Sequence, residues 1–223
     1  MHSVMPDGSV DVVIKISGGM TQGLAYGSTT SRHDVPLEKA SHYIGISFKA
    51  GQSRHFINAS AAELTNANVP LNGLLKFQLV DSYLFDNKGG IESNNLFSTL
   101  NFILENHIKK YSPVISRIDH IVQVIDSSGG VSPVTDYAEM SCKSMRQFER
   151  MFRETVGISA KLYSQIVRCQ RAITLISSTD LPLVHIAAEL GYSDQCHMTN
   201  QFRRFANSSP ASLARKRVAF LQD

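Results

Sequence analysis

Residues 185–214 read HIAAELGYSDQCHMTNQFRRFANSSPASLA, and residues 135–164 read TDYAEMSCKSMRQFERMFRETVGISAKLYS, fifty positions earlier. The two stretches share their apolar spacing and several identical residues. Each copy predicts a short apolar helix, a break and a longer amphipathic helix, which is the pattern of a helix-turn-helix. The repeated positions are Ala138 with Ala188, Glu139 with Glu189, Met140 with Leu190, Phe148 with Met198, Phe152 with Phe202, Arg153 with Arg203, Ser159 with Ser209, and Tyr163 with Leu213.

The repeat predicts an all-α region with two helix-turn-helix units. We expect the first unit at about 133–156, a connecting helix at 159–178 and the second unit at about 182–206. The second helix of such a unit enters the major groove of DNA, so double-stranded DNA is the expected partner. The apolar face of the first recognition helix is predicted to hold Met145, Phe148, Met151 and Phe152.

The opposite faces of the two recognition helices supply the candidate DNA contacts. Arg146 and Arg150 share one helix face, and arginine can bond guanine O6 and N7 together. Glu149 could accept from a cytosine amino group or orient an arginine. The predicted base contacts are Arg146, Glu149 and Arg150 in the first unit and Gln195, Cys196, His197 and Asn200 in the second, and the predicted phosphate contacts are Arg153, Arg203 and Arg204.

Charge is distributed unevenly along the 223 residues. Residues 1–129 hold 10 basic and 11 acidic residues, a net charge of −1, whereas residues 130–223 hold 12 and 8, a net charge of +4. The positive excess therefore coincides with the repeat, as expected if only that part binds a polyanion. A hydrophobic content of 43% with 18% charged residues is typical of a globular protein.

Other sequence patterns argue against several protein classes. No apolar run reaches the roughly 18–20 residues of a membrane helix, and no secretory signal is visible, so we expect a cytoplasmic protein. The odd number of cysteines, Cys142, Cys169 and Cys196, and the absence of CxxC disfavour a disulfide framework or zinc site. The histidines within 33–55 lack metal-ligand spacing, and GxSxG, P-loop and GxGxxG motifs are absent. We expect no enzymatic activity, cofactor or metal.

The N-terminal part has the composition of a small β-rich, barrel-like domain, so the overall fold class is expected to be α+β. The predicted strands are 10–16, 42–48 and part of 23–29, and the predicted short helices are Ser60–Leu64, which begins with a capping-box spacing, and Leu71–Leu75.

Two further amphipathic helices are expected between the β-rich part and the repeat. One covers about 94–110 and could belong to either half, link them or form a dimer contact. The expected division is a β-rich domain at 1–92, a linking helix at 93–112 and a DNA-binding domain at 113–223. The second helix is predicted from the apolar stripe Ile115, Ile118, Ile121, Val122 and Ile125.

The region from about 115 to 217 resembles the C-terminal DNA-binding domain of the AraC/XylS family of bacterial transcription regulators. The residues that carry the resemblance are Ser144–Phe152 with its RMF ending, Gly157, Tyr163, Arg168, Ala172, Ile186-Ala187, Glu189–Gln195, Phe202–Arg204 and Ser209-Pro210. The resemblance implies two recognition helices in adjacent major grooves. The family usually has glycine where Asn207 stands, often arginine at Asn200, an aromatic residue at Met198 and phenylalanine at Ala206.

The N-terminal part is similar to one AraC-type subgroup whose role is poorly defined. Such domains bind a small effector, dimerise or do both, and RNA polymerase is an expected partner if the protein is an activator. A partner-interaction module without a ligand is the main alternative, and a DNA-repair accessory protein is a third. An apolar pocket with a few polar groups would favour a sensor, whereas a flat exposed apolar patch would favour a partner or a dimer.

Overall fold

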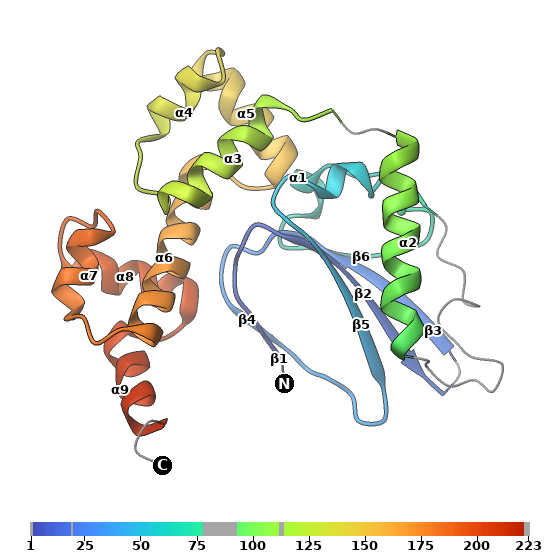
Figure 1. Cartoon of the computed structure of the whole chain (residues 1–223), viewed down its shortest axis with the longest axis horizontal. Coiled ribbons are helices and arrows are strands. Elements are labelled where there is room, and N and C mark those ends of the chain that lie inside the picture. The colour runs from blue at the N-terminus through green and yellow to red at the C-terminus, as the bar shows by residue number, and fades with distance from the viewer. Residues whose placement is uncertain (1, 19, 78–92, 112–113, 221–223) are drawn as a thin grey trace.

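The computed structural model describes residues 2–18, 20–77, 93–111 and 114–220, and it has the predicted α+β architecture. A β-rich part and a helical part lie beside each other (Figure 1). In the β-rich part, a four-stranded antiparallel sheet has the order β5-β2-β3-β6, and β1 pairs with β4 in a separate ribbon. The strands are β1 His2–Val4, β2 Val10–Ser17, β3 Met20–Tyr26, β4 His33–Val35, β5 His42–Phe48 and β6 Asn68–Pro70.

The sheet forms where β-branched residues alternate. Every second residue of β2, from Val10 to Ile16, is buried, as the period-2 pattern predicts. The predicted strand at 42–48 is confirmed as β5, and the strand expected over part of 23–29 is confirmed by β3, which covers 23–26 and begins earlier, at Met20. The short helix α1, Ala61–Leu64, begins with the predicted capping box between Ser60 and Glu63 and follows a 3-10 turn, Ser53–His55.

The predicted helix at Leu71–Leu75 is wrong. Leu71 donates its backbone N–H to Gly23 at 3.1 Å and so prolongs the sheet pairing, and Leu74 donates to Leu71 at 2.9 Å to close a turn. Leu75 then forms an isolated bridge with Ile57. Leu71, Leu74 and Leu75 have helical spacing because their side chains pack against the β-rich core. Neighbouring strands and turns, rather than a helix, supply their backbone hydrogen-bond partners.

Helix α2, Ser93–Tyr111, covers one face of the sheet (Figure 1). Leu100 is buried in the same core as Val12 and Ile14, and Leu104 packs against that core. The His107 imidazole Nε2 lies 2.8 Å from the His55 carbonyl oxygen. These contacts make α2 part of the N-terminal core rather than a bare link.

The helical part runs from α3 to α9 around one apolar core that includes Phe148, Phe152 and Phe202. Its long helix α6 joins the two repeated units (Figure 1). Ile115 was predicted to belong to the apolar stripe of α3, but it precedes the helix and is 79% exposed. The helices are α3 Arg117–Ser128, α4 Val134–Met140, α5 Met145–Val156, α6 Ala160–Ser178, α7 Leu183–Glu189, α8 Gln195–Ala206 and α9 Pro210–Phe220.

The fifty-residue register holds for the recognition helices α5 and α8 but not for the helices that precede them. The helix α7 starts 49 residues after α4, at 183 against 134, whereas α8 starts 50 residues after α5, at 195 against 145. Burial confirms the shift, because Ala138 corresponds to the buried Ala187 and Ala188 is exposed. The predicted pairing of Met140 with Leu190 is therefore wrong, as Met140 is 40% exposed and Leu190 is 2% exposed.

Candidate nucleic-acid interface

The first recognition helix, α5, presents its arginines along one face. Arg146, Arg150 and Arg153 are exposed at positions i, i+4 and i+7, and Glu149 is half-buried among them. The Ser144 hydroxyl caps the helix by accepting from the Gln147 N–H, and the Gln147 side chain accepts from the Ser144 N–H in return. Capping fixes the start of α5, so the exposed arginines project from a rigid element.

The inward stripe of α5 is confirmed in part. Phe148 and Phe152 are fully buried and their rings meet edge to face, with centroids 5.7 Å apart. Met145, predicted to face inward, is 41% exposed. It occupies the first position of the helix.

The second recognition helix, α8, exposes neutral groups near its start and cations at its end. Gln195, Cys196 and Asn200 are exposed, and Arg203 and Arg204 both lie in the last turn. The Asp194 carboxylate caps this helix, accepting from the His197 N–H at 2.7 Å. That hydrogen bond, despite a small opposing effect of burial, lowers the pKa of Asp194. The positive charge of α8 is therefore concentrated at one end, unlike that of α5.

His197 does not present a free ring. Its Nδ1 lies 3.1 Å from the Ser193 hydroxyl, and its Nε2 lies 3.0 Å from the Gln201 amide nitrogen. The Tyr192 ring stands edge to face with the imidazole at a centroid distance of 5.3 Å. Both ring nitrogens have partners within the unit, so this geometry favours a role in shaping the start of α8 over a base contact.

The connecting helix α6 ties the two units together through Arg168. One guanidinium nitrogen donates to the Gly130 carbonyl at 2.5 Å, and the other donates to the Gly191 carbonyl at 3.4 Å. The same guanidinium lies 5.4 Å from the centre of the Tyr192 ring. Gly130 precedes α4 and Gly191 lies in the turn of the second unit, so this one side chain joins the two units directly.

The β-rich part contacts the C-terminal end of α5. The Ser28 hydroxyl donates to the Val156 carbonyl at 2.9 Å, and the Thr65 hydroxyl donates to the Gly157 carbonyl at 2.8 Å. Gly157 ends the helix in a left-handed conformation, with φ of 95°. A β-carbon on Gly157 would lie 2.9 Å from the Ala61 carbonyl oxygen, so the absence of a side chain lets α1 pack directly against the helix end.

An ion pair fastens α3, which packs against both helices of the first unit, to the β-rich part. The Arg54 guanidinium donates to both carboxylate oxygens of Asp119, at 2.8 and 2.5 Å, and Asp119 is only 5% exposed. Asp119 also forms a capping box with Ser116 at the start of α3. Burial alone would raise the pKa of Asp119, but the hydrogen bonds from Arg54 and Ser116 outweigh it and hold the pKa below its usual value.

The β-rich part contacts the second unit more sparsely. The Arg32 backbone N–H donates to the Phe205 carbonyl at 3.2 Å, and its side chain donates to the Ala206 carbonyl at 3.4 Å. Ser28 and Arg32 thus reach the ends of both recognition helices from one short loop. These contacts could not be predicted from the sequence, because nothing local marks residues whose partners lie as many as 174 positions away.

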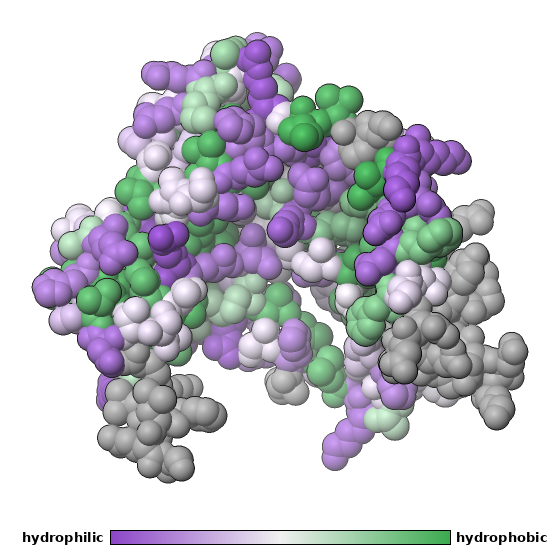
Figure 2. Space-filling view, viewed as in Figure 1, coloured by the Kyte–Doolittle hydropathy of each residue, from purple (hydrophilic) through white to green (hydrophobic). Residues whose placement is uncertain are grey.

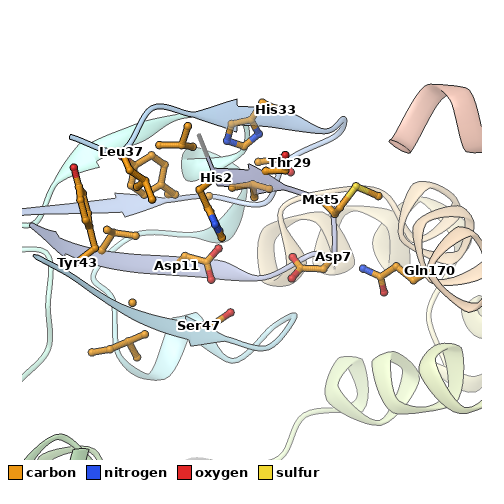
Figure 3. A pocket seen from close by; sticks show the side chains of 18 residues that line it. His2, Met5, Asp7, Asp11, Thr29, His33, Leu37, Tyr43, Ser47 and Gln170 are labelled. Carbon is orange, nitrogen blue, oxygen red and sulfur yellow. The ribbon is translucent and has the colours of Figure 1, made fainter. Parts of the chain in front are cut away.

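A cavity of about 600 Å³ lies in the β-rich part and extends to α6 (Figure 3). Most of its wall is apolar, from Met5, Val13, Leu37 and their neighbours, and Gln170 enters from α6. The Gln170 amide also donates to the Pro6 carbonyl at 2.9 Å. The volume falls within the range of small-molecule sites, roughly 300–1,000 Å³.

Two family models match the chain. Residues 137–216 match "Helix-turn-helix domain", and residues 1–70 match "Domain of unknown function (DUF6597)". The arabinose operon regulatory protein of Escherichia coli K12 is 25% identical over 108 residues, which cover 48% of this chain and 34% of that protein. The transcriptional activator RhaS of E. coli O139:H28 is 31% identical over 85 residues, which cover 38% of this chain and 31% of that protein. The chain spans about a third of the length of these relatives.

Solved structures give low similarity scores. The DNA-binding domain of AdpA, solved in complex with a target DNA, is 23% identical with a TM-score of 0.46, covering 49% of this chain and 100% of that one. ToxT of Vibrio cholerae is 10% identical with a TM-score of 0.47, covering 96% and 95%. The family assignment rests instead on the sequence matches and on the two capped recognition helices. The C-terminal part of this chain belongs to the helix-turn-helix domains of the AraC family.

Proposed function

We propose that this chain is a sequence-specific transcription regulator that places α5 and α8 in adjacent major grooves of double-stranded DNA. One observation carries the proposal: two recognition helices, each capped at both ends, are held by α6 in one rigid core with their polar faces exposed. The motif's second helix is the element that reads DNA bases. In the part of the chain that the structure describes, no helix has the length and apolarity needed to cross a lipid bilayer.

The two helices have different roles in this proposal. Arg146, Glu149 and Arg150 contact bases from α5, and Gln195, Cys196 and Asn200 contact bases from α8. Arg153, Arg203 and Arg204 contact phosphates, because they lie in the later turns of the helices. His197, with both ring nitrogens occupied, supports the start of α8.

The β-rich part is proposed to sense a small effector in the cavity. The cavity is largely apolar with a few polar groups, which is the composition of ligand sites. Gln170 connects the cavity to α6, the helix that sets the spacing of the two units. A bound ligand could therefore change the position of one unit relative to the other. Effector binding and DNA binding are then linked, and each ligand changes the affinity of the other by the same factor.

A second function of the β-rich part, homodimerisation through α2, is favoured by a specific observation. Phe97 is 67% exposed on α2, and Ile108 is exposed on the same face. Val114 and Ile115, which lie between α2 and α3, are also exposed. Figure 2 shows a hydrophobic patch in the region between these two helices. Sedimentation velocity distinguishes the two functions, because the Phe97→Ser variant should become monomeric only if α2 forms the dimer contact.

The DNA-binding proposal is tested by selection from a random pool of duplex DNA. The full chain should enrich a defined sequence, and the enriched duplex should bind about 10³-fold or more tightly than random DNA at physiological salt. Failure to enrich any sequence would contradict the proposal. RNA polymerase is a further partner if transcription from a promoter carrying the enriched site rises on addition of the protein.

A further inference from the structure

The polar groups in the cavity wall are dominated by carboxylates. Asp7 and Asp11 both line the cavity, and Figure 3 shows Asp11 on β2 and Asp7 on the segment that leads into this strand. Among the 18 residues that line the cavity there is no lysine or arginine. The uncharged or weakly basic polar groups are the two histidines, His2 and His33, together with hydroxyls and one amide. The charge of the wall is therefore negative.

Asp11 is held in the wall without a basic partner among the described residues. The Ser9 hydroxyl donates to its carboxylate at 3.2 Å, and no described lysine or arginine forms an ion pair with Asp11 or Asp7. Burial raises the pKa of Asp11, a hydrogen bond from Ser47 opposes this, and the charge of Asp7 raises it further. Desolvation and like-charge repulsion are both relieved when a cation occupies the space beside the two carboxylates.

The remaining lining residues of the cavity favour a ligand with an apolar portion. Val13, Val35, Leu37 and Ile46 line the same cavity, and the aromatic ring of Tyr26 adds to this surface. A bound anion would face the carboxylates with no compensating cation, and burying an unpaired charge is unfavourable. A neutral apolar ligand would leave the carboxylates unpaired.

We infer that the cavity binds a small organic cation in which an ammonium group is joined to an apolar body, with the ammonium against Asp11 and Asp7. The inference rests on the proposed sensor function and names its ligand class. Gln170 of α6 lines the Asp7 end of the cavity (Figure 3), so the cationic end of the ligand lies beside the helix that joins the two DNA-reading units. An ammonium there could donate to the Gln170 side-chain oxygen as well as to the carboxylates.

The test uses the full chain and three probes with the same alkyl body: octylammonium, octanol and octanoate, titrated by calorimetry without DNA. Octylammonium should bind about tenfold or more tightly than octanol, the order expected for a partly desolvated charge pair, and octanoate should bind most weakly. Asp11→Asn should remove the preference for octylammonium over octanol. Asp11→Glu should retain it, which separates loss of charge from loss of folding.

The matched control is Asp136→Asn, which makes the same change in net charge at an exposed position on α4 and should leave octylammonium affinity unchanged. Equal or tighter binding of octanoate, a preference that survives in the Asp7→Asn/Asp11→Asn double variant, or no binding of octylammonium would each overturn the inference. Because no DNA is present, failure of DNA binding leaves this result intact. Ligand binding that does not change DNA affinity would instead contradict the sensor function.

Discussion

The two helix-turn-helix units have the same fold but differ in how they are charged and how they are attached. The first unit has three arginines spread along α5 and is fastened to the β-rich part by Ser28 and Thr65. The Arg54–Asp119 pair adds to this indirectly, because it fastens α3, which packs against α5. The second unit has its two α8 arginines in the last turn and is contacted mainly through Arg32. The two copies therefore share the same helical fold but differ in their exposed side chains and in their contacts with the β-rich part.

This difference suggests that the two units contribute differently to DNA binding. The unit that is anchored more firmly also has side chains suited to bidentate guanine contacts, so it is expected to provide more of the specific binding energy. The more loosely attached unit has neutral groups near its start and is expected to tune or extend the site. Rigid attachment favours the first role, because a pre-organised contact loses less entropy on binding.

The largest expected difference between the two units is in how much their contacts with the β-rich part contribute to the free energy of unfolding. Arg54→Met leaves the buried Asp119 carboxylate without its cation, and we expect the free energy of unfolding to fall by about 2–4 kcal/mol, near the value for breaking a buried pair. Arg32→Met, the matched change at the second unit, should cost about 1 kcal/mol, because it removes one side-chain hydrogen bond to the Ala206 carbonyl and partly exposed contacts with Ser3 and Asp34, while the backbone bond to Phe205 remains. Urea denaturation of both variants provides the measurement. Equal losses would mean that the two units are equally attached.

The second-largest expected difference between the two units is in base recognition. Arg150→Ala should weaken binding to the selected duplex by about 1–3 kcal/mol and relax one base preference, since a bidentate contact is lost. Asn200→Ala in the second unit should cost less, about 1 kcal/mol. Fluorescence anisotropy on the selected and random duplexes checks both. An equal loss on selected and random DNA would reassign Arg150 to the phosphate backbone.

Phosphate contacts should affect salt dependence rather than sequence. Arg203→Ala should reduce the slope of log Kobs against log salt by about one unit, because one fewer counterion is released. Arg153→Ala should do the same in the first unit. An unchanged slope in either variant would place that arginine away from the DNA backbone.

The smallest expected difference concerns the helix caps. Asp194 caps α8 with a carboxylate whose pKa is lowered in the folded protein, whereas the Ser144 hydroxyl that caps α5 does not titrate. A lowered pKa means that this stabilisation is present above the ordinary aspartate value of 3.8 and is lost as pH falls through the folded value. Amide exchange at His197 should therefore accelerate in acid relative to Gln147. Parallel pH dependence at the two amides would contradict it.

Much of the helical part could be predicted from the sequence, because caps and apolar periodicity are local signals. Ser144, Asp194 and the left-handed Asn207, with φ of 49°, lie at helix ends, where serine, aspartate and asparagine are favoured. The 49-residue offset between α4 and α7 could not be predicted from the sequence, because Ala187 and Ala188 are adjacent alanines that only burial distinguishes.

The contacts between the two parts could not be predicted. Ser28, Arg32 and Arg54 are ordinary polar residues in loops and turns, and their partners become neighbours only when both cores have formed. The cavity could not be predicted either, because its lining residues come from five different strands and from α6. The turn at Leu71–Leu75 shows the converse error, in which core packing imitates helical spacing.

Two unequal recognition helices on one face of DNA should be visible in the affinity of the full chain for every single base-pair substitution in the selected duplex. We expect two blocks of sensitive positions about one helical turn, roughly 10 bp, apart. The block whose sensitivity is flattened by Arg150→Ala should show the larger summed loss of affinity, and Asn200→Ala should flatten the other. A single sensitive block, or a larger summed loss in the block that depends on Asn200, would contradict this expectation.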